Sequence, residues 1–143
     1  MILSQTWRYA VRALIRLAQH GDKAPVLSST IAEEEDIPAP FLVKILGMLA
    51  NSGLINSTRG PRGGFWLNRK PDTITLMEIA RATGYFGGND ACLLGYGLCS
   101  DGTPCAIHEH WAGPLEHISD FLENTTLEDL AHTMKKESKT AVS

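Results

Sequence analysis

Two short helical segments followed at once by a glycine-rich hairpin constrain the fold of this chain more than any other feature. Apolar periodicity predicts helices over residues 28–35 and 40–51, with prolines at the break between them. Strand-like runs follow at 54–58 and 65–68, joined by the turn sequence Arg-Gly-Pro-Arg-Gly-Gly. Two helices and a hairpin in this order predict a winged helix-turn-helix, in a fold that is mainly α with a small β wing.

Capping signals indicate where several helices begin. A threonine followed three residues later by glutamate can satisfy the free backbone N–H groups of a first helical turn. Such pairs are Thr30 with Glu33, Thr75 with Glu78, and Thr125 with Glu128. Besides the two helices of the central motif, we expect helices over residues 4–20, 75–82, 106–123 and 127–134.

The second helix of the motif is the one that enters the major groove in this architecture. Its outward-facing residues include Val43 and Lys44. Its expected buried stripe is Phe41, Leu42, Ile45, Leu46 and Leu49. In the wing, arginine supplies charge for phosphates and a narrow minor groove, while glycine lets the backbone approach the duplex. The candidate contacts to double-stranded DNA are Thr30, Pro40, Phe41, Lys44, Arg59, Gly60, Pro61, Arg62, Gly63 and Gly64.

The charge distribution supports this placement although the chain as a whole carries a net charge of −3. Residues 1–71 hold nine basic and five acidic residues, whereas residues 72–143 hold four basic and eleven acidic residues. A basic front half can meet phosphates while an acidic back half faces elsewhere. Because no apolar run approaches the ~20 residues that span a bilayer, and no secretory signal is evident, we expect a cytoplasmic protein without membrane contact.

All three cysteines lie close together in the second half of the chain. They form the series Cys92-x6-Cys99-x5-Cys105, and His108 follows the third cysteine. Thiolates are soft ligands that favour iron–sulfur clusters, zinc and copper(I), and imidazole can replace a thiolate at a cluster iron. The series therefore predicts a [2Fe–2S] or [4Fe–4S] cluster held by these four residues, with Asp90 or Glu109 as other candidates for the fourth ligand.

Two alternatives to a cluster stay open. The cysteines could bind zinc, although their spacing lacks the paired C-x2-C units of common zinc fingers, or act as bare thiol redox sensors.

An enzyme using Cys105 as nucleophile and His108 as base would need an electropositive setting. The segment is acidic and glycine-rich, so we expect a protein that is not an enzyme.

The helix expected after the cysteines has a seam suited to a second subunit. Trp111, Leu115, Ile118 and Leu122 recur at spacings of four, three and four residues, although Pro114 interrupts the hydrogen-bonding pattern. The expected division of the chain is 1–83 for the DNA-binding domain, 84–105 for the cluster-binding loop, 106–134 for the dimerisation and terminal helices, and 135–143 for a polar tail.

Several stretches in this order resemble the Rrf2 family of winged-helix transcription regulators. The matching stretches are Leu3-Ser4, Arg8–Ala13, Phe41–Ile55, Ser57–Phe65, the three cysteines, His108, Trp111 and Thr126–Leu130. The resemblance implies a homodimer clasped by a long helix. We expect a repressor or dual regulator that senses iron–sulfur status, redox state or nitric oxide. It also implies that the three cysteines and one further residue ligate the cluster. Because position 8 is arginine, the resemblance points to His108 rather than an acidic N-terminal residue.

The sequence departs from the family pattern at three places, one of which is Pro114 in the expected dimerisation helix. The first cysteine gap is six residues where the family's cluster-assembly regulator has five. Positions 43 and 44 hold Val and Lys where that regulator has Glu and Gln, so its operator sequence does not carry over.

Overall fold

The computed structural model describes residues 4–21, 25–84, 94 and 106–140, with side chains as far as residue 134. Along the chain it contains α1 (Gln5–His20), α2 (Ser28–Glu35), α3 (Ala39–Asn51), β1 (Ile55–Thr58), β2 (Gly64–Leu67), the 3-10 turn η1 (Pro71–Thr73), α4 (Leu76–Ala82), α5 (His108–Asn124) and α6 (Leu127–Thr140). The expected mainly helical fold with a small β wing is confirmed. Most predicted helix starts are correct within two residues.

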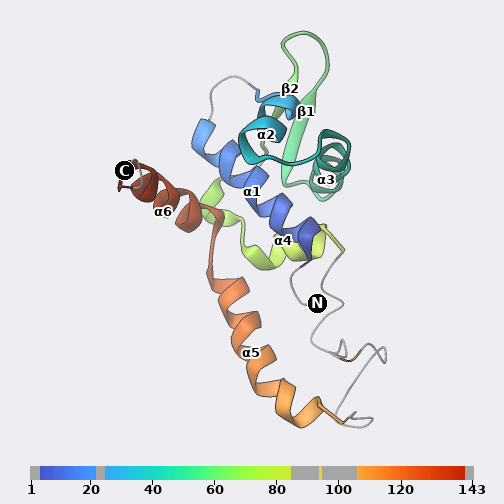
Figure 1. The fold of residues 1–143 in the computed structure, drawn as a ribbon, viewed down its shortest axis with the longest axis vertical. Coiled ribbons are helices and arrows are strands. Elements are labelled where there is room, and N and C mark those ends of the chain that lie inside the picture. The colour runs from blue at the N-terminus through green and yellow to red at the C-terminus, as the bar shows by residue number, and fades with distance from the viewer. Residues whose placement is uncertain (1–3, 22–24, 85–93, 95–105, 141–143) are drawn as a thin grey trace.

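Helix α1 forms the centre of the fold. It lies between the wing with α2 and α3 on one side and α4, α5 and α6 on the other (Figure 1). Its residues Ala10, Leu14 and Leu17 are buried in a core that includes side chains from all these elements. From α5 and α6 this core takes Leu122 and Leu127, so the C-terminal helices share one core with the DNA-binding motif.

The turn between α2 and α3 is short and begins with a left-handed residue. Asp36 has a φ of 53°, and the N–H of Ile37 donates to the carbonyl of Ala32. The predicted capping box of Thr30 and Glu33 is wrong, because α2 begins at Ser28 and has no side-chain cap. Thr30 is inside the first turn, where its N–H donates to the carbonyl of Leu27.

The wing is an antiparallel pair, β1 and β2, extended by one residue that precedes α2. Ile55 pairs with Leu67 and Thr58 with Gly64. On the other edge of β2, Val26 and Phe65 exchange both backbone hydrogen bonds, with N···O distances of 2.9 and 2.8 Å. The wing and the start of α2 are therefore held at a fixed spacing.

A second pairing joins the starts of α4 and α6. Thr75 forms an antiparallel bridge with Thr126, flanked by hydrogen bonds from the N–H of Leu76 to the carbonyl of Thr125 and from the N–H of Leu127 to the carbonyl of Ile74. We call this pairing of 74–76 with 125–127 the α4–α6 joint. It connects the end of α5 to the DNA-binding motif, and the indole Nε1 of Trp7 donates to the carbonyl of Leu76 at 3.3 Å.

The two helices that meet at the joint carry similar caps. The predicted capping box of Thr75 and Glu78 is confirmed. The cap predicted from Thr125 and Glu128 is wrong, because Thr126 and Asp129 form it one residue later. The backbone of Thr125 is used elsewhere, since its N–H closes α5 and its carbonyl accepts the bond from Leu76.

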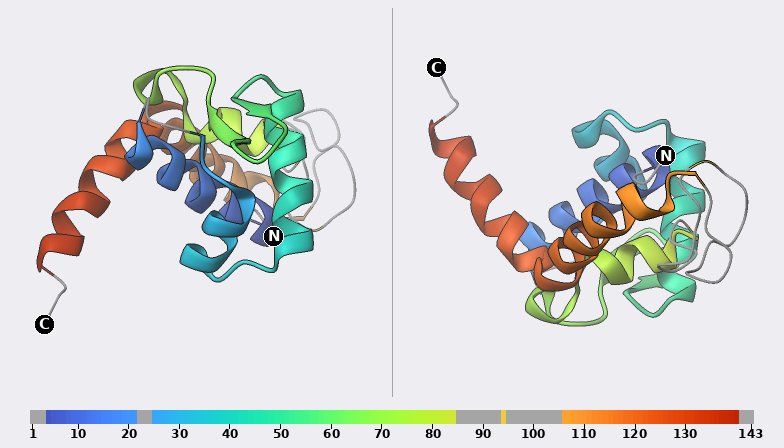
Figure 2. Two further views of the ribbon diagram at one scale, coloured as in Figure 1. Left: turned by 90° about the horizontal axis from the view of Figure 1, so that it is seen from above. Right: turned by 90° about the horizontal axis from the view of Figure 1, so that it is seen from below.

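The C-terminal helices differ from expectation in two further ways. Helix α5 runs from His108 to Asn124 without a break at Pro114. Helix α6 continues to Thr140 rather than ending near residue 134, and its end projects from the body in both views of Figure 2. In the described part of the chain, no helix is long and apolar enough to cross a membrane.

Candidate nucleic-acid interface

Helix α3 presents a mixed outer face. Leu42, Ile45, Leu46 and Leu49 are buried as predicted. On the opposite face Val43 is 56% exposed and Met48 is 40% exposed, and Lys44 lies beside them. This face offers one cation and two apolar groups, so it can contact a phosphate or guanine and thymine methyl groups.

The structure corrects the placement of Phe41. Sequence periodicity assigns Phe41 to the buried stripe, and it is also a candidate DNA contact. In the structure the residue is 38% exposed. It packs in a T-shaped arrangement on Tyr9 of α1, with ring centroids 5.7 Å apart and an interplanar angle of 82°. The contact with Tyr9 of α1 covers part of the Phe41 ring.

Helices α1 and α2 are joined by a buried carboxylate that sequence reasoning missed. Glu35 accepts from Arg12 Nε at 3.2 Å and from Arg16 Nε at 2.7 Å, and Arg12 also donates to the Glu35 carbonyl. The pattern that could have revealed this is the spacing of the two arginines, four residues apart on one face of α1, together with an acidic run at 33–36.

The tip of the wing divides into an exposed and a buried part. Arg59, Gly60, Pro61 and Arg62 are exposed, as a DNA-contacting tip requires. Gly63 and Gly64 are buried, so they do not offer open backbone to a duplex. Both instead permit close packing within the chain. A Cβ at Gly64 would lie 2.6 Å from the carbonyl oxygen of Val26, and one at Gly63 would lie 2.4 Å from that of Thr58.

Ion pairs within the chain determine which basic side chains of residues 1–71 can bind DNA phosphates. Arg12 and Arg16 pair with Glu35, and Arg69 pairs with Glu78 at 3.1 Å. Within the described residues of 1–71, the cations outside any ion pair are Arg8, Lys44, Arg59, Arg62 and Lys70. Three of these lie on the recognition helix and the wing tip, the two elements of the predicted interface.

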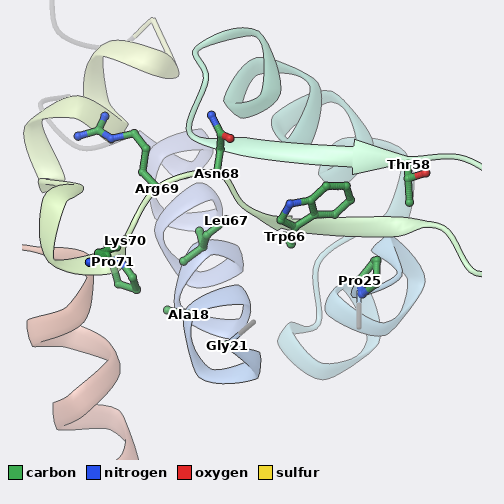
Figure 3. Close-up of a pocket in the computed structure, with 10 residues that line it drawn as sticks. All are labelled: Ala18, Gly21, Pro25, Thr58, Trp66, Leu67, Asn68, Arg69, Lys70 and Pro71. Carbon is green, nitrogen blue, oxygen red and sulfur yellow. The ribbon is translucent and has the colours of Figure 1, made fainter. Parts of the chain in front are cut away.

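A cleft of about 630 Å³ lies at the base of the wing, between the end of α1, strand β2 and η1 (Figure 3). Trp66, Leu67 and Pro71 supply apolar walls. The amide of Asn68 is engaged by the side chain of Asn56 and by the carbonyl of Gly53, and the guanidinium of Arg69 is bonded to Glu78 and Thr73. These polar side chains hold the strand and η1 in place at the foot of the wing.

The predicted dimer seam on α5 is partly used within the chain. Leu122 is fully buried, and Ile118 packs against the same core, whereas Trp111 and Leu115 are half-buried. Leu122 therefore belongs to the chain's own core, since α5 closes over α4 there. Sequence reasoning missed Phe121, which is 54% exposed on the same helix.

The predicted metal ligands Cys92, Cys99 and Cys105 lie outside the described residues. His108 is the first residue of α5 and is half-buried. Among the residues that the structure describes, no three or more histidine, cysteine, aspartate or glutamate side chains gather into a group that could hold a metal ion.

A helix-turn-helix with an arginine-tipped wing, rigidly paired to the start of α2, defines a winged-helix DNA-binding transcription regulator. The family model of Rrf2, described as an iron-dependent transcriptional regulator, matches residues 3–133. The chain belongs to the Rrf2 family.

Known proteins that match more than nine-tenths of this chain support the assignment. An HTH-type transcriptional regulator of Aquifex aeolicus is 39% identical over 95% of each chain. The HTH-type transcriptional regulator IscR of Vibrio vulnificus is 35% identical over 91% of this chain and 77% of its own. The solved structure of CymR, the global cysteine regulator of Bacillus subtilis, superposes with a TM-score of 0.77 at 28% identity, covering 93% of this chain and 98% of that one. These relatives are transcription regulators, not enzymes.

Proposed function

We propose that this chain is a homodimeric repressor whose affinity for its operator is set by an iron–sulfur cluster bound to Cys92, Cys99, Cys105 and His108. The observation that carries the DNA-binding half is the location of Lys44, Arg59 and Arg62. These cations have no ion pair within the described chain and are exposed on the recognition helix and wing tip. Lys44 enters the major groove with Val43 and Met48, and the wing arginines enter the adjacent minor groove.

The chemistry of the donor set supports the cluster. Three cysteines supply soft thiolates, and an imidazole three residues beyond the third can complete a four-ligand site. The family's description as iron-dependent agrees with this set. When bound, the cluster would supply one-electron redox chemistry and reactivity toward oxidants or nitric oxide. His108 would tie the cysteine-bearing segment to the first turn of α5.

Helix α5 offers a route from the cysteines to the DNA-binding motif. Its N-terminal residue is His108, it packs against α4, and its last turn runs into the α4–α6 joint. At that joint the carbonyl of Leu76 also accepts from Trp7 of α1. A change in the position of α5 would therefore act on α4 and α1. Coupling energies between such sites are typically about 1–3 kcal/mol, enough to switch a promoter.

Anaerobic purification with visible absorption spectra and counts of iron and acid-labile sulfide tests the proposal. The wild-type chain is expected to be coloured and to contain both elements. Cys99→Ala is expected to abolish the colour and leave the helical content unchanged, whereas the neighbouring Ser100→Ala keeps both. A colourless wild-type chain holding zinc, or holding no metal and reacting through its thiols, would contradict the cluster.

A further inference from the structure

A continuous series of contacts links the end of α2 to the first turn of the recognition helix by way of α1. Glu35, the last residue of α2, is held by Arg12 through its carboxylate and its backbone carbonyl. The Arg12 guanidinium lies 5.5 Å from the centroid of the Tyr9 ring. Tyr9 in turn contacts Phe41 of α3 edge to face. The series thus spans the turn between α2 and α3 without passing through it.

The turn between α2 and α3 is short, and both helices also pack on α1. Between Glu35 and Ala39 the chain has one left-handed residue, Asp36, and one buried side chain, Ile37. Contacts from α1 to both helices therefore add to the direct packing of α2 on α3 in setting the geometry of the helix-turn-helix. Arg12 contacts both parts of this series, because it donates a hydrogen bond to Glu35 of α2 and lies over the ring of Tyr9, which contacts α3.

We propose that Arg12 is a positioning residue for operator recognition, which fixes the angle of α3 through Glu35 and the Tyr9–Phe41 pair, and not a ligand of DNA phosphate. Its charge is compensated by Glu35, whose side chain is 10% exposed. A planar guanidinium can bond a carboxylate and a carbonyl while lying over an aromatic ring, which an ammonium cannot reproduce. The inference rests on the DNA-binding function and is independent of the cysteine site.

Arg12→Lys distinguishes a positioning role from a phosphate contact. It keeps the positive charge, but it removes the paired hydrogen bonds to Glu35 and the planar group over the Tyr9 ring. The probe is a duplex selected by the wild-type chain from a random-sequence library, compared with a scrambled duplex of the same composition. Arg12→Lys is expected to weaken binding to the selected duplex about tenfold and to change binding to the scrambled duplex by less than about twofold. The slope of log affinity against log salt is expected to stay unchanged.

Arg16→Lys is the matched control. Arg16 lies one turn further along α1 and also pairs with Glu35, at 2.7 Å. Its ion-pair partners, Glu34 and Glu35, both belong to α2, so its ion pairs do not lead on to α3. Its selected-duplex affinity is expected to stay within about twofold of the wild type. If Arg16→Lys lost selectivity as strongly as Arg12→Lys, the specific role of Arg12 would be overturned.

Tyr9→Leu tests the second half of the series. Its effect on selected-duplex affinity is expected to be non-additive with that of Arg12→Lys in a double-mutant cycle, because both break the same link. Free energies of unfolding measured on the same variants separate general destabilisation from positioning. Three outcomes would refute the proposal. The first is full retention of selected-duplex affinity in Arg12→Lys, and the second is an equal loss of affinity for both duplexes. The third is strict additivity of Arg12→Lys with Tyr9→Leu.

Discussion

At the scale of single residues, the fold divides the basic side chains between structure and function. Arg12, Arg16 and Arg69 are held by carboxylates, whereas Arg59 and Arg62 extend from the wing tip without an ion pair in the described chain. Counting basic residues along the sequence therefore overstates the charge that a duplex meets. The salt dependence of binding should reflect the smaller, unpaired set.

Arg59→Ala is expected to weaken operator binding about tenfold and to reduce the salt slope by about one. The exposed arginine at the wing tip has no partner to lose within the described chain, so folding stability should be unaffected. Binding titrations at several salt concentrations measure both quantities. Arg81→Ala, which removes an exposed arginine from α4 instead, is the control and should leave both unchanged.

Gly64 is predicted to be a stability residue rather than a DNA contact. Its φ of 148° favours glycine, and an added Cβ would meet the backbone of Val26 at 2.6 Å. Gly64→Ala should therefore lower the free energy of unfolding by about 2 kcal/mol, measured by urea denaturation. Gly47→Ala has open space in the middle of α3 and should instead raise stability by about 0.5–1 kcal/mol. A stable Gly64→Ala chain would show that the Val26–Phe65 bridge can shift.

Residue-level features explain where sequence reasoning succeeded. Leu42, Ile45, Leu46 and Leu49 were predictable because a helical period of apolar residues reports one buried face directly. Phe41 was not, since its environment depends on Tyr9, which is distant in sequence. Likewise the burial of Glu35 depends on two arginines of another helix, a tertiary contact that no local pattern contains.

At the scale of elements, local capping signals compete with tertiary pairing. The box at Thr75 was predictable because the side chains of Thr75 and Glu78 cap α4 even though Thr75 also bridges Thr126 and Glu78 also pairs with Arg69. The cap of α6 is one residue later than predicted, although the helix starts at Leu127 as expected, because the backbone of Thr125 is committed to α5 and to Leu76. Similarly, α2 begins directly after Leu27, since Val26 is held by Phe65 of the wing. In both cases a neighbouring element constrains how a helix begins.

The cap of α6 predicts a measurable pH dependence. The backbone N–H of Thr126, and then its side chain, hold the pKa of Asp129 below its ordinary value of 3.8. A carboxylate whose pKa is lower in the folded state stabilises the fold above its unfolded pKa, and this contribution is lost as pH falls through the folded pKa. Asp129→Asn should therefore flatten the dependence of Tm on pH below about pH 4.

Asp120→Asn provides the control for this measurement. It makes the same chemical change at an exposed position on α5, outside any cap. Its Tm should follow the wild-type dependence on pH. If Asp129→Asn and the wild type lost Tm in parallel on acidification, the cap of α6 would not contribute to acid sensitivity.

At the scale of the whole molecule, the assembly is the least predictable property. Leu122, one of the four residues of the expected dimer seam on α5, is buried in the chain's own core. Phe121 on the same helix is 54% exposed. We therefore predict that Phe121→Glu shifts the proposed dimer toward monomer, measured by analytical ultracentrifugation, and weakens operator binding with it. Glu123→Gln, an exposed change two residues away, should leave the dimer intact. A Phe121→Glu chain that sediments like the wild type would place the dimer contact elsewhere.

The α4–α6 joint has a consequence for how the state of this molecule could be monitored. Because Leu122 and Leu127 share one hydrophobic core with the DNA-binding motif, a signal that displaces α5 is expected to change the free energy of unfolding. Occupied and empty forms of the proposed sensor should then melt at different temperatures, even in the absence of DNA. A calorimeter could report the regulatory state before any promoter sequence is known.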